Sequence, residues 1–187
     1  MVEKTKKCLI DAKKNKEKHF LLIQKANIQV RKQAMIDKSK TIIHVASGAA
    51  GGVGLIPIPF SDALAIVPIQ AGMIYKMNDA FGVKIEDFVA ASLITGLLGV
   101  TAVAQVGRTL VNGLFKLIPG VGSVVGSVAG GTTAAIITEG MGFAYLKVLE
   151  TCFNDEIGEV KLPAMDTIKF LFKESYLSLN TIEKLKP

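Results

Sequence analysis

The sequence has few of the residues from which catalytic and metal sites are built. Among its 187 residues are two cysteines, two histidines and no tryptophan. Two cysteines far apart in sequence cannot form the framework of a disulfide-rich secreted domain. Metal sites need clusters of ligands, and His44 lies in an apolar stretch, so we interpret it as a core histidine. With no paired carboxylates or Cys–His pair, the sequence predicts a protein that is not an enzyme and has no metal and no cofactor.

Nucleotide-binding and export signals are also missing. A phosphate-binding P-loop needs a Gly-Lys pair followed by Ser or Thr, and the sequence has no Gly-Lys pair. A secretory signal needs a continuous apolar segment after its basic residues, but Leu9 and Ile10 are followed at once by Asp11. We therefore expect the protein to be cytoplasmic or on the cytoplasmic side of a membrane.

Charge is distributed unevenly along the chain. Residues 1–40 hold 11 Lys and Arg31 against four acidic residues, a net charge of +8, whereas residues 41–187 have a net charge of −2. Such asymmetry points to an acidic partner, and the near absence of aromatic residues in 1–40 disfavours single-stranded nucleic acid. We predict an anionic membrane surface as the partner, with a solvated helix as the alternative. The predicted membrane-binding residues are Lys4, Lys6, Lys7, Lys13, Lys14, Lys16 and Lys18.

The rest of the chain is very apolar. Residues 88–107 and 117–138 contain no Lys, Arg, Asp or Glu. A helix that spans a membrane needs ~20 mainly apolar residues, so we expect a transmembrane or membrane-bound hairpin at about 86–138. A buried core in a soluble helical bundle explains the same runs, and the sequence leaves both readings open.

Apolar residues recur at helical rather than strand spacing, so we predict an all-α fold. It comprises a basic amphipathic helical arm (1–40), a glycine-rich apolar domain (41–150) and a linker with a C-terminal amphipathic helix (151–187). We expect helices at about 3–38, 62–80, 85–117, 121–150 and 164–180. A turn at Pro57 and Pro59 precedes Asp62, an N-cap candidate, and Gly82 closes the helix that follows. Glu139 is expected to pair with Arg108.

Glycines recur at every fourth position in two segments. This spacing makes a smooth helix face against which a second helix can pack closely, in membranes or in soluble proteins. The predicted helix-packing residues are Gly48, Gly52, Gly122, Gly126 and Gly130.

Two segments carry a family resemblance. GLIPIPFSDALAIVPIQAGMIYKMNDAFGV at 54–83 and LIPGVGSVVGSVAGG at 117–131 resemble the YcjF-like family, a domain of unknown function often found C-terminal to Era-like GTPase domains. The resemblance covers residues 41–150 and implies a helical, membrane-associated module that works beside a GTPase. Because this chain has no P-loop, GTP chemistry is not carried over, and a GTPase is expected only as a separate partner.

From these observations we predict a non-enzymatic, membrane-associated helical module that acts beside a GTPase or another partner protein. The alternatives are a soluble helical bundle that binds a partner protein, and a glycine-zipper pore-forming or effector protein. The sequence leaves open whether the protein forms a homo-oligomer.

Overall fold

The fold is all-α, as the sequence predicts. A computed structural model of the chain describes residues 2–53, 61–84, 90–101 and 124–184. In chain order the elements are α1 (Val2–Val53), α2 (Ser61–Ala80), a helical segment at 90–101, α4 (Val124–Thr151), a short hairpin of β1 (Phe153–Asn154) and β2 (Glu159–Val160), and α5 (Met165–Lys184). Helices therefore form at every predicted position that the structure describes.

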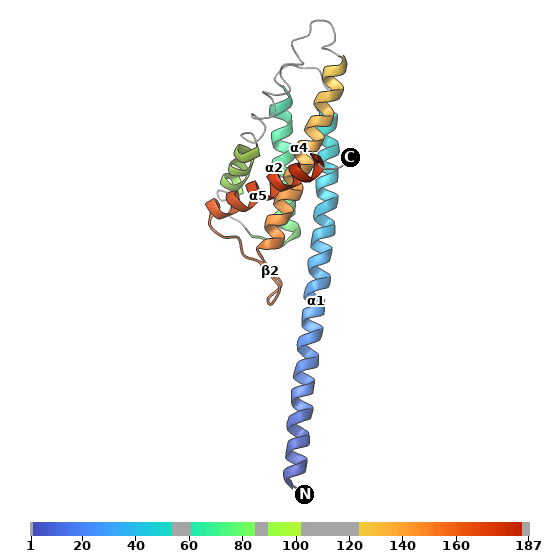
Figure 1. The fold of residues 1–187 in the computed structure, drawn as a ribbon, viewed down its shortest axis with the longest axis vertical. Helices are drawn as coiled ribbons and strands as arrows, with labels where there is room; N and C mark the ends of the chain where they lie inside the picture. The colour runs from blue at the N-terminus through green and yellow to red at the C-terminus, as the bar shows by residue number, and fades with distance from the viewer. Residues whose placement is uncertain (1, 54–60, 85–89, 102–123, 185–187) are drawn as a thin grey trace.

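The dominant element is α1, a single helix of 52 residues. At ~1.5 Å per residue it is about 78 Å long, and Figure 1 shows it extending far past the other helices to the N-terminus. The first 47 residues contain no Gly or Pro, which would weaken the helix interior. The helix runs without a break through residue 40, so the expected arm and the expected glycine-rich domain share one element.

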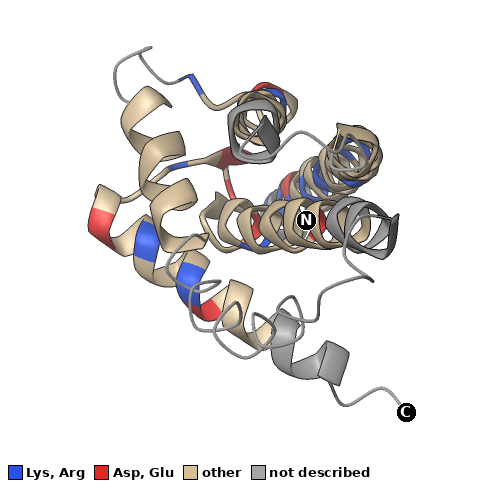
Figure 2. Ribbon diagram, turned by 90° about the horizontal axis from the view of Figure 1, so that it is seen from above, with Lys and Arg blue, Asp and Glu red and all other residues tan. Residues whose placement is uncertain are grey.

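Helices α2 and α4 pack against the C-terminal half of α1, and α5 packs on α4, so that together they form the body of the protein (Figure 1). Their core joins residues from every described helix and from the hairpin: Ile43, Met73, Met77, Leu93, Leu97, Met141, Tyr145, Leu149, Phe153, Ile168 and Phe172. Burying apolar surface is the main favourable term in folding, at roughly 25 cal/mol per Å². Most of the ribbon of the body is neither basic nor acidic, and α5 contains residues of both charge signs (Figure 2).

The end of α2 forms as the sequence predicts. Gly82 has a positive φ of 67°, which glycine adopts without strain. Its N–H donates to the carbonyl of Asp79, and the N–H of Val83 donates to the carbonyl of Asn78. These two bonds are the Schellman pattern, which satisfies carbonyls at the helix end. Val83 then packs on the core, so this turn directs the chain back along the body.

Some side chains of the two uncharged segments, 88–107 and 117–138, are buried inside the body. Leu93 and Leu97 are buried in the core, and Ala134 and Thr138 are buried on α4. Across the residues that the structure describes, none of the helices combines the length and the apolar character that crossing a membrane would require. The predicted transmembrane helix is thus not found there, while residues 85–89 and 102–123 of the predicted hairpin lie outside the described residues.

Helix α4 packs closely against α1 at Gly142, a glycine that the sequence analysis did not select. A Cβ atom at this position would lie 2.6 Å from Cγ1 of Ile43 and 3.0 Å from Sδ of Met73. By contrast, Gly48 and Gly52 are exposed, and a Cβ at either would meet nothing within 4 Å. Among the described residues, Gly48 and Gly52 therefore make no close helix contact, because they lie on the side of α1 turned away from the body.

Candidate interaction surface on the first helix

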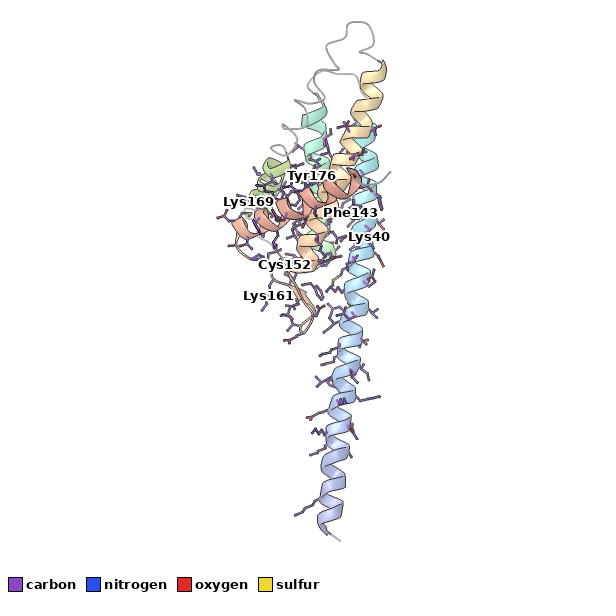
Figure 3. All side chains as sticks on the ribbon, viewed as in Figure 1. Lys40, Phe143, Cys152, Lys161, Lys169 and Tyr176 are labelled. Atoms are coloured by element: carbon purple, nitrogen blue, oxygen red, sulfur yellow. The ribbon has the colours of Figure 1, made fainter. Side chains whose placement is uncertain are left out.

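The N-terminal half of α1 is a helix without neighbours in the described structure. Every side chain from residue 12 to residue 27 is exposed, and in Figure 3 the side chains of this part radiate from a single ribbon. We call residues 2–27 the free arm. Such a helix gains no stability from tertiary packing, which supplies most of the stability of helices in proteins. The free arm is therefore a surface available to a partner.

The free arm is basic and also carries large apolar side chains. Residues 12–27 contain five lysines and one glutamate, Glu17. Lys6, Lys13, Lys14, Lys16 and Lys18 are exposed, and Lys4 and Lys7 lie on the same helix, although their side chains are outside the described part. Four consecutive apolar residues, Phe20 to Ile23, are each between 55% and 60% exposed. Since one helical turn holds ~3.6 residues, these four residues encircle the helix.

The hairpin of β1 and β2 contacts α1 just after residue 27, the last residue of the free arm. Asp155 accepts hydrogen bonds from Lys32 Nζ at 2.9 Å and from Gln29 Nε2 at 3.0 Å. The Lys32 ammonium also lies 4.8 Å from the centre of the Phe153 ring. These contacts lower the pKa of Asp155 below its ordinary value, first through the hydrogen bond from Lys32 and then through that from Gln29.

The hairpin also packs tightly against α1 at the place where the free arm meets the body. Gly158 has a φ of 73°, and a Cβ there would lie 3.2 Å from Cγ1 of Ile28, the first residue of α1 after the free arm. The hairpin thus fixes the direction in which the arm leaves the body. Sequence reasoning did not identify this contact, because the paired residues are more than 120 positions apart.

His44 lies on the surface, which corrects its assignment as a core histidine. Its side chain is 61% exposed and its Nδ1 lies 3.1 Å from Oε1 of Glu139. The imidazole also makes an edge contact with the ring of Phe143, at 5.8 Å between centroids. Glu139 therefore pairs with His44 across α1 and α4, whereas the expected partner Arg108 lies outside the described residues.

Polar pairs inside the body join α2 to α4. Gln70 Nε2 donates to Thr138 Oγ1 at 3.1 Å, and the Tyr145 hydroxyl donates to Oδ1 of Asn78. All four residues are buried. Burial raises the pKa of Tyr145 above its ordinary value because it disfavours the phenolate, so this hydroxyl stays a hydrogen-bond donor. These pairs set the register of the two helices.

The described part of the body contains a shallow groove with charged residues on its wall. No group of three or more His, Cys, Asp or Glu there could hold a metal ion. A groove of about 290 Å³ lies between α1, α4 and α5. Its wall includes Lys40 and Phe143, both labelled in Figure 3. Lys40 pairs with Asp37, and Lys147 on the same wall pairs with Glu150. The lysines of this groove therefore take part in ion pairs of the kind that is common on protein surfaces.

Several predicted residues fall where side chains are not described. Pro57, Pro59 and Gly122 lie outside the described residues. Asp62 is the second residue of α2, which begins at Ser61 as expected for a helix start at this point. Gly126 and Gly130 lie in α4. Their proposed helix contacts, and the capping role of Asp62, stay predictions.

Taken together, the chain is an all-α protein with a packed helical body and a long, basic, exposed helical arm. It belongs to the family described as "Domain of unknown function (DUF697)", which matches residues 18–171 and so includes most of α1. It is also 27% identical over 128 residues to "Magnetosome membrane protein 22" of Magnetospirillum gryphiswaldense. The match covers 68% of this chain and 63% of that relative, less than two thirds of its length. No solved structure matches the chain.

Proposed function

We propose that the protein is a non-enzymatic, membrane-associated module that binds the anionic cytoplasmic surface of a membrane through the free arm. The observation that carries this proposal is the full exposure of residues 12–27, with five lysines against one glutamate. A Lys or Arg near an anionic leaflet contributes ~1 kcal/mol of binding free energy. Exposed apolar side chains at Phe20 to Ile23 add a contribution from burial at the lipid interface.

One further observation supports a membrane role. The matched relative is a magnetosome membrane protein by name. Among the described residues, the body is held by hydrophobic packing and by buried polar pairs such as Gln70–Thr138. The proposed binding therefore uses the arm, whose side chains take no part in that packing.

The resemblance to the YcjF-like family adds a partner to the proposal. Because that module often follows an Era-like GTPase domain, we propose that this protein acts beside a separately encoded GTPase. The chain itself contains no P-loop lysine, so any nucleotide chemistry belongs to the partner.

Vesicle flotation tests the membrane proposal. The full chain is compared with a variant in which Lys13, Lys14, Lys16 and Lys18 are changed to Gln. At ~1 kcal/mol per lysine, binding to vesicles containing phosphatidylserine should weaken by roughly 10²–10³-fold. Binding should also weaken with salt, because exposed charges are screened over ~8 Å at physiological ionic strength.

A matched control distinguishes the loss of lysines on the arm from a loss of net charge anywhere on the protein. The control changes Lys76, Lys84, Lys161 and Lys173 to Gln; these are four exposed lysines of the body, and the loss of charge is the same. It should bind within about threefold of wild type, since its lysines are not on the arm. Equal loss in both variants, or equal binding of wild type to neutral vesicles, would reject the proposal and favour the soluble helical bundle.

A further inference from the structure

The two parts of α1 are held in different ways. Among the residues that the structure describes, no side chain between residues 12 and 27 takes part in a hydrogen bond or an ion pair, and all of them are exposed. Beyond the free arm, by contrast, α1 packs on the core of the body through Ile28, Met35, Ile36 and Ile43. Figure 3 shows one continuous ribbon, but only the part beside the body has tertiary contacts that stabilise it.

The sequence of the free arm stabilises its helix only weakly. Lys14 and Lys18 are four residues apart and Lys13 and Lys16 are three apart, so each pair lies on one side of the helix, where like charges repel. Glu17 is the one acidic residue of the exposed stretch. The part of α1 beside the body nucleates the helix, but each residue added to it gains little free energy in water. The arm therefore favours the helix over the coil by a small margin.

The hairpin of β1 and β2 is the part of the body that α1 meets directly after the free arm. Ile28 lies against Gly158, where a Cβ would come within 3.2 Å of it, and Lys32 donates to Asp155 at 2.9 Å. Local opening of a protein is easiest where buried contacts are few and hardest inside the core. The hairpin therefore lies at the boundary between the part of α1 that can open alone and the part that opens only with the body.

We propose that residues 12–27 exchange between helix and coil in solution, that the hairpin sets the limit of this exchange, and that an anionic surface makes the arm fully helical. Only the last of these steps rests on the proposed membrane function. An anionic leaflet supplies counter-charges for the lysines and an apolar interface for Phe20 to Ile23, and it thereby removes the repulsion that weakens the helix. Binding and folding of the arm are then coupled, so the apparent affinity depends on the helix population of the unbound arm.

Hydrogen exchange of the full chain without lipid tests the first step. Backbone amides of residues 12–27 should exchange within about tenfold of the rate of an unfolded chain, whereas those of residues 36–50 should exchange at least ~10³-fold more slowly than an unfolded chain. This measurement does not depend on any membrane. Equal protection of the two stretches would overturn the proposal, because the arm would then be a stable helix before it binds anything.

The same measurement with vesicles tests the coupling of folding to binding. Vesicles that contain phosphatidylserine should raise the protection of residues 12–27 at least ~10-fold, and vesicles of phosphatidylcholine alone should leave it unchanged, because they lack the negative charge. An arm that binds the anionic vesicles and stays unprotected overturns coupled folding. A chain that does not bind them contradicts the proposed membrane function and the last step with it, while the lipid-free exchange is decided by the first measurement.

Two alanines of α1 provide matched variants that leave the charge unchanged. Ala26 and Ala34 are both helical and exposed, but Ala26 lies in the free arm and Ala34 beside the body. Glycine in place of alanine lowers the stability of a helix about fivefold, the equivalent of ~1 kcal/mol. Ala26→Gly should therefore weaken binding to anionic vesicles about three- to fivefold, and Ala34→Gly less than about 1.5-fold. An arm that is always helical, or that binds as a coil, predicts no effect of Ala26→Gly, and that result would overturn coupled folding.

Asp155→Ala tests the role of the hairpin. It removes the acceptor of the hydrogen bonds from Lys32 and Gln29, so the amides of residues 28–32 should exchange at least ~threefold faster, a larger change than in residues 43–50. Glu156→Ala is the control, because Glu156 carries the same charge, is exposed, and makes no side-chain hydrogen bond or ion pair among the described residues. It should change these rates by less than about 1.5-fold. If the two variants behave alike, the hairpin does not set the limit of the exchange.

Discussion

Gly142 is the position where the packing of α4 on α1 can be tested most directly. A methyl group added here would approach Cγ1 and Cγ2 of Ile43 at 2.6 and 2.9 Å, closer than carbon atoms normally pack. Ile43 is fully buried, and its branched side chain has few rotamers to move into. We therefore expect Gly142→Ala to force a shift in the core, at a cost of about 1–3 kcal/mol for overpacking.

The same substitution also favours the helix, since Ala is better than Gly in a helix interior by up to ~1 kcal/mol. Gly48→Ala isolates this second effect, because Gly48 is helical, exposed and has nothing within 4 Å of a Cβ. The difference between the two variants should therefore report the clash alone, about 1–3 kcal/mol. For a chain of this size, that corresponds to a melting-temperature difference of roughly 2–12 °C.

Urea unfolding of the full chain, followed by circular dichroism, measures both variants. A third variant, Gly142→Ala with Ile43→Ala, removes the two Ile43 atoms that lie nearest to the new methyl group. The two changes should then cost less together than the sum of their separate costs, by at least ~1 kcal/mol. If Gly142→Ala stabilises the protein as much as Gly48→Ala does, the close contact between α1 and α4 at Gly142 is refuted.

Two other predictions concern polar contacts. Gln70→Leu and Thr138→Val should each destabilise the body by about 1–3 kcal/mol by leaving a buried partner without its hydrogen bond, whereas the double variant should be close to wild type; additive losses in urea unfolding would contradict this pairing. Asp155 has a pKa lowered from 3.8, so its contribution to stability is present above that value and is lost as the pH falls through the lower folded-state pKa. Asp155→Asn should therefore be less stable than wild type at neutral pH, and the gap should close on acidification; a gap that is constant with pH would show that the Lys32–Asp155 contact does not contribute.

Local features of the chain could be predicted from the sequence because they depend on nearby residues. Helical spacing gave the positions of α2, α4 and α5 within a few residues. The end of α2 was predicted from Gly82, and the structure shows two hydrogen bonds that close the helix there. The exposed lysines of the arm also follow from composition, because so many like charges in one segment favour solvent.

The contacts between elements could not be predicted in the same way. Gly48 and Gly52 are four residues apart, which is the spacing typical of close helix contacts, yet α4 packs closely on α1 at Gly142. A spacing tells which residues share a face of one helix but not which face meets a neighbour. His44 illustrates the same limit, since an apolar segment predicted burial and the orientation of α1 left its side chain exposed beside Glu139.

The sequence by itself therefore determined the helices, their ends and the basic character of the N-terminal segment, all of which arise from interactions over a few residues. Only the tertiary structure decided that α1 continues unbroken from the arm into the body, that the hairpin holds it through Lys32 and Asp155, and that residues 12–27 stay exposed. These features depend on the relative orientation of elements more than 100 residues apart, which is fixed by the simultaneous packing of all the helices into one core.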